Sequence, residues 1–92
     1  MATKKDPDER FPERNSPVIE ALAFNVKRLR KAKHLTQVQF AKAVGIDQPT
    51  LSLLESGRAN PTLLVVERIA TLLDIDVRDL LRRKPHVTAK TK

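Results

Sequence analysis

The sequence predicts an all-α fold, a compact bundle of five helices. Apolar residues recur at helical spacing in five separate segments, and no segment shows the alternation typical of a strand. Most of these segments are flanked by residues that commonly start or end a helix. Hydrophobic residues make up 40% of the chain and aromatic residues only 3%, so the core must consist mainly of Leu, Val, Ile and Ala. This composition suits packed helices.

The first helix is expected over residues 17–33. Ser16 stands at the N-cap, and Pro17 takes the first helical position, where its missing N–H has no intrahelical partner. An apolar stripe for the core follows at Ile19, Leu22, Ala23, Val26 and Leu29. Basic residues from Lys27 to Lys33 fill the last turns, where cations favour the negative end of the helix dipole.

A short second helix is expected over residues 37–44. Thr36 and Gln39 have the spacing of a capping box, which satisfies two backbone N–H groups at a helix start. Gly45 then ends the helix, because glycine adopts a positive φ without steric cost.

The third helix, about residues 48–56, follows immediately, with Asp47 as its N-cap and Gly57 after its last turn. Ala41 in the preceding helix is small enough to let the two helices approach, and Leu51 and Leu54 are expected to point into the core. The order of small residue, glycine and two apolar residues at this spacing indicates a helix-turn-helix motif.

The fourth helix is opened by Asn60-Pro61-Thr62, and its inward stripe is expected to be Leu63, Val66, Ile69, Ala70 and Leu73. Asp76 caps a short fifth helix, and Pro85 ends the ordered structure. We therefore divide the chain into a flexible N-terminal arm (1–15), a helix-turn-helix domain (16–82) and a basic C-terminal tail (83–92).

Composition argues against several classes of protein. The 92 residues suit one domain, and the chain has no Cys for a disulfide or a thiolate metal site. No apolar run approaches the roughly 20 residues that a membrane span needs, and the N-terminus does not resemble a secretory signal. His34 and His86 lie far apart, and no catalytic arrangement is visible. We expect a cytoplasmic protein with no metal, no cofactor and no enzymatic activity.

The net charge of +7 predicts an anionic partner, with nucleic acid the leading candidate and solvated surface lysines the alternative. Much of the excess lies in residues 82–92, which contain Arg82, Arg83, Lys84, Lys90 and Lys92 and no acidic residue. A second basic cluster lies in the first helix, at Lys27, Arg28, Arg30, Lys31 and Lys33.

Taken together, these motifs resemble the Xre/Cro-like, phage-repressor type of helix-turn-helix transcriptional regulators. The resemblance covers about residues 20–81 and includes the order of all five helices. It rests on Thr36-Gln37-Val38-Gln39-Phe40-Ala41, Gly45, Leu51-Ser52, Leu54-Glu55-Ser56-Gly57, Asn60-Pro61, Ile69-Ala70 and Leu80. It implies that the second helix lies across the DNA backbone and that the third enters the major groove.

The resemblance implies that bases are read by Gln48, Thr50, Ser52 and Leu53. Gln48 matches the base-reading residue at the front of the third helix, and a Gln amide can pair with N6 and N7 of adenine. Thr50 and Ser52 are short hydrogen-bonding residues. Leu53 can pack on a thymine methyl group, although simple packing against the protein is an alternative role.

The resemblance also implies phosphate contacts and one ion pair. Gln37 matches the residue that contacts phosphate and braces the recognition helix, and Arg58 matches a phosphate-contacting position after that helix. Lys42 and Asn60 are expected to add to these contacts. In the family, residues matching Arg30 and Glu55 form a partly buried ion pair between the first and third helices, which we interpret as structural.

Three residues depart from the family pattern. Pro49 replaces a residue that often reads a base, Asp47 stands where Ser or Thr is more usual, and His34 stands where a glycine commonly ends the first helix. These departures predict an altered base code within the same fold.

Surplus apolar residues in the last two helices predict a homodimer. They are Leu64, Val65, Leu72, Val77 and Leu81. An exposed apolar patch usually marks an interface, and proteins of this type pair to read two half-sites about 34 Å apart. The alternative is that the N-terminal arm, through Phe11, or the C-terminal tail covers these residues.

The sequence thus predicts a homodimeric regulator of transcription that binds double-stranded DNA sequence-specifically, and we expect a repressor. No small-molecule effector is expected, because no conventional ligand-binding domain is visible. Alternatives with the same fold are the antitoxin of a toxin pair and the controller of a restriction-modification system. A helical adaptor that binds protein instead of DNA is the alternative from another class.

Overall fold

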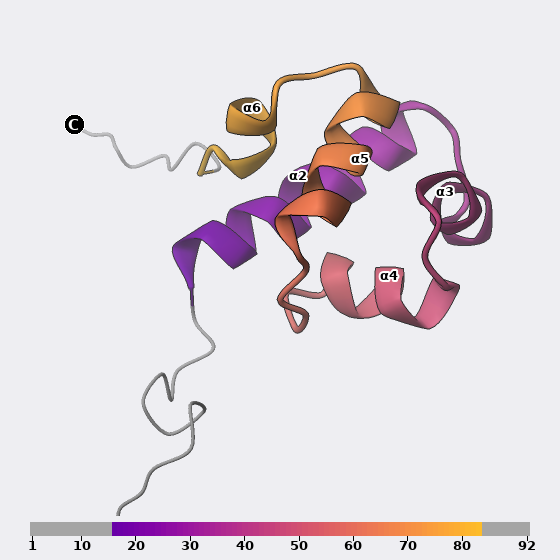
Figure 1. The fold of residues 1–92 in the computed structure, drawn as a ribbon, viewed down its shortest axis with the longest axis horizontal. Coiled ribbons are helices and arrows are strands. Elements are labelled where there is room, and N and C mark those ends of the chain that lie inside the picture. Colours follow the sequence, from indigo (N-terminus) through magenta and orange to yellow (C-terminus); the bar gives the residue numbers. More distant parts are fainter. Residues whose placement is uncertain (1–15, 84–92) are drawn as a thin grey trace, which may run out of the picture.

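The computed structural model describes residues 16–83, which fold into helices joined by short turns (Figure 1). The helices are α2 (Pro17–Ala32), α3 (Gln37–Val44), α4 (Gln48–Glu55), α5 (Leu63–Leu73) and α6 (Val77–Leu81). The all-α architecture and the order of the five helices are those expected from the sequence, and no strand occurs within this part of the chain. The expected arm (1–15) and the tail beyond Arg83 lie outside the described residues.

Every helix begins at a side chain that caps it. In each case a side-chain oxygen of the N-cap residue accepts a hydrogen bond from a backbone N–H of the first turn. These residues are Ser16, Thr36, Asp47, Thr62 and Asp76. The capping box of α3 is complete, since the side chain of Gln39 also accepts from the backbone N–H of Thr36 at 2.9 Å. The helix starts predicted from the sequence are thereby confirmed.

Within residues 16–83, four residues take the left-handed backbone conformation where helices end. Gly45 (φ 91°) and Gly57 (φ 78°) do so after α3 and α4, as predicted. His34 (φ 60°) adopts it after α2, the place where a glycine is usual in the family. Asp74 (φ 59°) caps α5 in the same way and was not foreseen, although Asp is one of the few side chains that tolerate this conformation.

The buried core draws on all five helices. Its members are Leu22, Val26, Phe40, Ala41, Val44, Leu51, Leu54, Val66, Ile69, Ala70, Leu73 and Leu80. The expectation that Leu63 points inward is wrong, because its side chain is 78% exposed. Leu63 is the first residue of α5 and lies almost a full turn before Val66, the first residue of that helix to enter the core. Ile19 and Leu29, also expected inward, are only half-buried.

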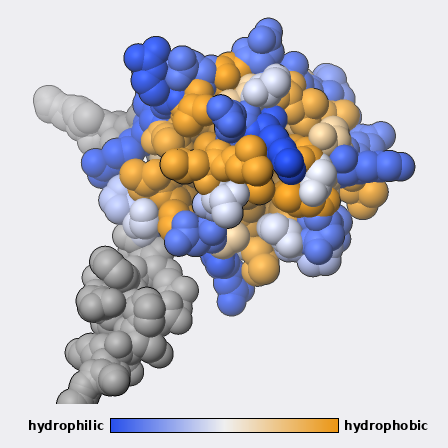
Figure 2. Space-filling model, viewed as in Figure 1, coloured by the Kyte–Doolittle hydropathy of each residue, from blue (hydrophilic) through white to orange (hydrophobic). Residues whose placement is uncertain are grey.

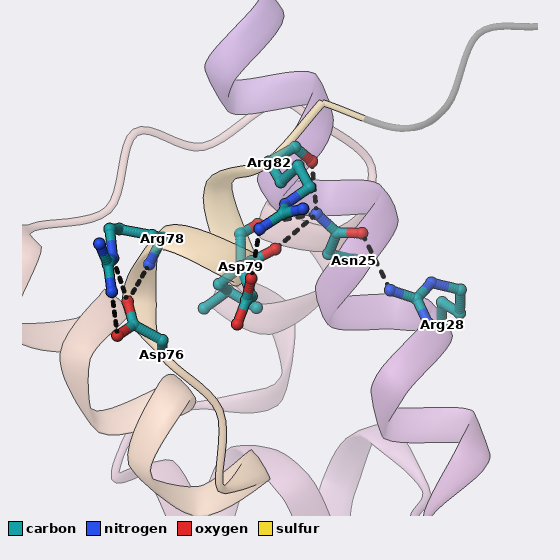
Figure 3. Close-up of polar contacts among 7 residues, drawn as sticks. Asn25, Arg28, Asp76, Arg78, Asp79 and Arg82 are labelled. Atoms are coloured by element: carbon teal, nitrogen blue, oxygen red, sulfur yellow. Dashed lines mark hydrogen bonds and ion pairs between the residues drawn. The ribbon is translucent and has the colours of Figure 1, made fainter.

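Helix α2 packs against α4, α5 and α6 and is therefore the scaffold on which the other elements are placed. In Figure 1 it passes behind α5, with α6 near its first half. The contact with α6 is fixed by Asn25, which is only 4% exposed. Its Nδ2 donates to the carbonyl oxygens of Leu80 and Arg82 at 2.9 Å and of Asp79 at 3.4 Å (Figure 3).

The sequence interpretation overlooked Asn25, because it treated the stripe of α2 as apolar only. The available signal was its position, three residues after Leu22 and one before Val26, where a polar side chain falls among buried neighbours. Its Oδ1 accepts from Arg28 at 3.2 Å, so both ends of the amide have partners. The amide satisfies carbonyls that the short α6 leaves open at its C-terminus.

Replacing Asn25 by Ala is expected to lower the free energy of unfolding by about 1–3 kcal/mol, because buried carbonyls at the end of α6 lose their donor. A domain of this size loses roughly 4–8 °C of Tm for each kcal/mol, so thermal unfolding followed by circular dichroism measures the effect. Asn60→Ala, at an exposed position, is the matched control. A Tm unchanged by Asn25→Ala would contradict this role.

Candidate nucleic-acid interface

The turn between α3 and α4 sets the angle between them. The backbone N–H of Gly45 donates to Ala41 O at 2.8 Å, and that of Ile46 donates to the same oxygen at 3.0 Å. Ala41 is buried beneath the turn, as its small size predicted. A Cβ on Gly45 would lie 3.5 Å from Nη1 of Arg68, an ordinary contact. The requirement for glycine here therefore comes from its positive φ and not from lack of space.

Helix α4 has one buried and one exposed face. Leu51, Leu54 and Glu55 are buried, which fixes the helix against the rest of the domain. The four candidate base-reading residues are exposed: Gln48, Thr50, Ser52 and Leu53. The side chain of Leu53 is 47% exposed and so does not fill the core, where Leu54 already lies. The exposed face thus offers one amide, two hydroxyl groups and one apolar side chain.

Asp47 holds the start of this exposed face in place. Its Oδ1 accepts from the backbone N–H of Thr50 at 2.8 Å. Hydrogen bonding with the side chain of Thr50, and then with its backbone, lowers the pKa of the Asp47 carboxyl. The carboxylate therefore stays ionised at neutral pH and places a negative charge beside the first turn of α4.

The candidate phosphate-contacting residues lie on α3 and in the loop after α4. Gln37 is the first residue of α3 and is half-buried, whereas Lys42 on α3 is exposed. Arg58 and Asn60 lie exposed in the loop after α4. Within residues 16–83 the side chains of Lys42, Arg58 and Asn60 form no hydrogen bond or ion pair, so their polar groups are available to a ligand.

The structure brings Arg30 and Glu55 together in a buried, two-point ion pair. Nε of Arg30 donates to Oε2 of Glu55 at 2.7 Å, and its Nη2 donates to Oε1 at 3.0 Å. The two side chains are only 8% and 2% exposed. Nη1 of Arg30 also donates to the carbonyl of Leu35 at 2.6 Å, so one guanidinium ties α2 to α4 and to the loop before α3.

Two glutamines extend this ion pair to the exposed face of α4. Nε2 of Gln37 donates to Oε1 of Glu55 at 3.0 Å, and Nε2 of Gln48 donates to Oε1 of Gln37 at 2.7 Å. The sequence interpretation placed Gln37 as a brace for α4 but missed its bond to Glu55. The signal was the carboxylate of Glu55, which directly follows the core residue Leu54 as the last residue of α4, since a buried acid needs several donors.

The candidate dimer residues differ in exposure. Leu64 is 55% exposed, whereas Val65, Leu72, Val77 and Leu81 are half-buried and pack against the core. Leu63, which the sequence interpretation assigned to the core, joins Leu64 at the exposed start of α5. Figure 2 shows apolar surface gathered over the middle of this view, where α5 passes in Figure 1.

The described part of the chain contains neither a membrane-spanning helix nor a cluster of metal ligands. None of its helices is long and apolar enough to cross a membrane. No group of three or more His, Cys, Asp or Glu side chains is placed there to hold a metal ion.

A family model described as HTH_3, helix-turn-helix, matches residues 26–80, which is more than half of the chain. The chain belongs to the HTH_3 helix-turn-helix family. The matched segment includes α3, α4 and the ion pair between Arg30 and Glu55. It agrees with the resemblance to Xre/Cro-like regulators, and the chain is a DNA-binding helix-turn-helix regulator of transcription.

Relatives of this regulator include a phage control-region protein and an antitoxin. It is 42% identical over 55 residues to the ImmF control region 10 kDa protein of Bacillus phage phi105, covering 60% of this chain and 61% of that protein. It is 42% identical over 53 residues to antitoxin HigA1 of Mycobacterium tuberculosis, covering 58% of this chain and 36% of the antitoxin. The match thus spans less than two thirds of either relative.

Among solved structures, the fold is similar to the restriction-modification controller protein C.AhdI from Aeromonas hydrophila. The TM-score is 0.64 and the identity 32%, over 67% of this chain and 94% of the controller.

Removing one partner of the buried ion pair is expected to cost about 3–5 kcal/mol of unfolding free energy, because the other charge stays buried without compensation. The single variants are Arg30→Met and Glu55→Leu. The double variant is expected to lose clearly less than the sum of both, since it leaves no unpaired charge.

Urea unfolding of the four proteins measures this coupling. Asp79→Asn, which breaks the exposed pair with Arg82, is the control and is expected to cost no more than about 1 kcal/mol. Additive single losses would show that the two charges do not depend on each other.

Proposed function

We propose that this regulator binds double-stranded DNA as a homodimer, with α4 in the major groove of each half-site, and that it represses transcription. The observation that carries the proposal is the hydrogen bond between Gln37 and Gln48, which presents a fixed amide on an exposed helix face. The opposite face of α4 is buried by Leu51, Leu54 and Glu55, so the helix is presented as a rigid unit.

Specificity comes from the exposed face of α4. Gln48 pairs with one base, and Thr50 and Ser52 provide shorter hydrogen-bonding groups beside it. Leu53 adds an apolar contact to a thymine methyl group, in accordance with its exposure. Pro49 offers no hydrogen-bond donor, so fewer bases are read than in a helix with a full row of polar side chains.

Affinity comes mainly from the phosphates. Lys42, Arg58 and Asn60 have unpaired polar groups around α4, and Gln37 retains a second amide N–H after bonding to Glu55. Such contacts fix the register of the protein on the duplex without reading its sequence. The basic tail after Arg82 adds sequence-independent attraction.

The apolar surface at α5 and α6 supports dimerisation. Leu63 and Leu64 expose most of their side chains next to the partly buried Val65, and charged residues are absent from these three positions. Contiguous exposed apolar surface of this kind favours association with a second copy. A symmetric dimer then places two copies of α4 on successive half-sites.

The controller of a restriction-modification system is the second candidate. The observation that favours it is coverage, because the similarity extends over 94% of the controller chain but over only 36% of antitoxin HigA1. The repressor and the controller are both transcriptional roles of the same DNA-binding surface. The identity of the neighbouring genes would distinguish these two roles.

Gln48→Ala is expected to reduce discrimination at one base pair by about 1–3 kcal/mol, because the alanine cannot pair with a base edge. The operator is first selected from a random duplex pool, and competition binding then compares its base-pair variants. Thr71→Ala, an exposed change on α5, is the control. An unchanged preference at every position of the operator would refute the assignment of Gln48.

Leu64→Glu is expected to dissociate the dimer, because two charges would be buried against each other at the symmetric contact. Sedimentation equilibrium measures the mass, and circular dichroism checks that the fold is retained. Glu67→Gln, an exposed change on the same helix, is the control. A monomeric wild-type protein at micromolar concentration, or a dimer that survives Leu64→Glu, would contradict this interface.

A further inference from the structure

The buried ion pair is linked by hydrogen bonds to Gln48, the residue proposed to read a base. Oε1 of Glu55 accepts from Arg30 and from Gln37, both at 3.0 Å, and Oε2 accepts from Arg30 at 2.7 Å. The Glu55 side chain is 2% exposed, so water does not compete for these positions. An ionised carboxylate has no proton to donate, and it can act only as an acceptor.

This restriction determines how both glutamine amides are oriented. Because Glu55 only accepts, the atom of Gln37 that faces it must be Nε2, and Oε1 of Gln37 must then face Gln48. That oxygen also only accepts, so the atom of Gln48 at 2.7 Å must be Nε2. Gln48 is left with its own Oε1 and one remaining N–H for the DNA.

The remaining pair of groups distinguishes adenine from guanine. In the major groove adenine presents a donor at N6 and an acceptor at N7, which match one acceptor and one donor on Gln48. Guanine presents two acceptors, O6 and N7. An amide that has already given one N–H to Gln37 cannot satisfy both of them.

We propose that Glu55 is a specificity-determining positioning residue, which makes Gln48 select adenine over guanine by fixing the orientation of both glutamine amides. The inference rests on the proposed function, because it requires Gln48 to contact a base. It assigns to the ion pair a role beyond joining α2 to α4.

The decisive variant is Glu55→Gln. The new amide has the same shape but offers both a donor and an acceptor, so it no longer dictates which end of Gln37 faces it. Gln48 can then turn two N–H groups toward the DNA. The preference for adenine over guanine at the base pair read by Gln48 is expected to fall by about tenfold, within the range that one bidentate pair supplies.

Competition binding of the full chain measures this preference on operator duplexes that carry each base pair at that position. Five proteins are compared: wild type, Glu55→Gln, Gln48→Ala, the double variant and Asp79→Asn. The last is the matched control, because it also neutralises a carboxylate paired with an arginine, 2.7 Å away, but on α6. Its preference is expected to equal that of the wild type.

Each outcome has a definite reading. A loss of adenine preference in Glu55→Gln that disappears in the Gln48→Ala background supports the proposal. Equal weakening on all four duplexes shows that Glu55 acts only through the fold, which overturns the inference and leaves the proposed function intact. If Gln48→Ala itself changes no preference, both are overturned, because the hydrogen bonds then end on a residue that reads no base.

A second variant keeps the test decisive if Glu55→Gln fails to fold. Gln37→Met leaves both residues of the ion pair in place and removes the connection between Glu55 and Gln48. This variant is also expected to weaken binding to all duplexes equally, because the proposed phosphate contact of Gln37 is lost. The same loss of adenine preference is expected in addition to this uniform weakening. Full retention of the preference in a folded Gln37→Met protein would overturn the proposal.

Discussion

The position of α4 depends on one buried charge pair. Arg30 and Glu55 are removed from water, which is costly, and the cost is offset only because nearly every polar atom of the pair has a partner. Those partners belong to α2, to the loop before α3, to α3 itself and to α4. Hydrophobic packing alone would allow α4 to slide or rotate slightly, whereas directional hydrogen bonds at its last turn do not.

Helix α2 carries a second buried polar group, Asn25, five residues before Arg30. Asn25 holds the end of α6, and Arg30 holds the end of α4. One rigid helix thus connects the surface proposed to read DNA with the elements that carry the proposed dimer contact. This connection matters physically, because the separation of two half-sites is set by the geometry between these two surfaces.

Local rules predicted the parts of the fold that depend on local chemistry. Caps such as Thr36 and Asp47, and the left-handed Gly45, follow from neighbouring residues, and the structure agrees. Features that depend on tertiary contacts were harder to predict from the sequence. The burial of Asn25 depends on carbonyls more than fifty residues away, and the exposure of Leu63 depends on where the core ends, which helical periodicity does not specify.

The candidate site shows the same division. The family resemblance identified Gln37, Gln48 and the ion pair as candidates. The hydrogen bond between Gln37 and Glu55 is visible only in the three-dimensional structure. That bond connects residues from the buried interior to the exposed face. The sequence identifies each of these residues separately. It does not show which donor faces which acceptor.

The first turn of α4 adds weight to the orientation of Gln48 in the proposed DNA complex. Helix N-termini often bind phosphate through free backbone N–H groups. Here Pro49 has none, Thr50 donates its N–H to the Asp47 carboxylate at 2.8 Å, and Leu51 donates to the Asp47 carbonyl at 3.1 Å. The negative charge of Asp47 further opposes a phosphate at this end. In the proposed DNA complex, positioning therefore relies mainly on side chains around α4, and the oriented amide of Gln48 supplies much of the sequence information.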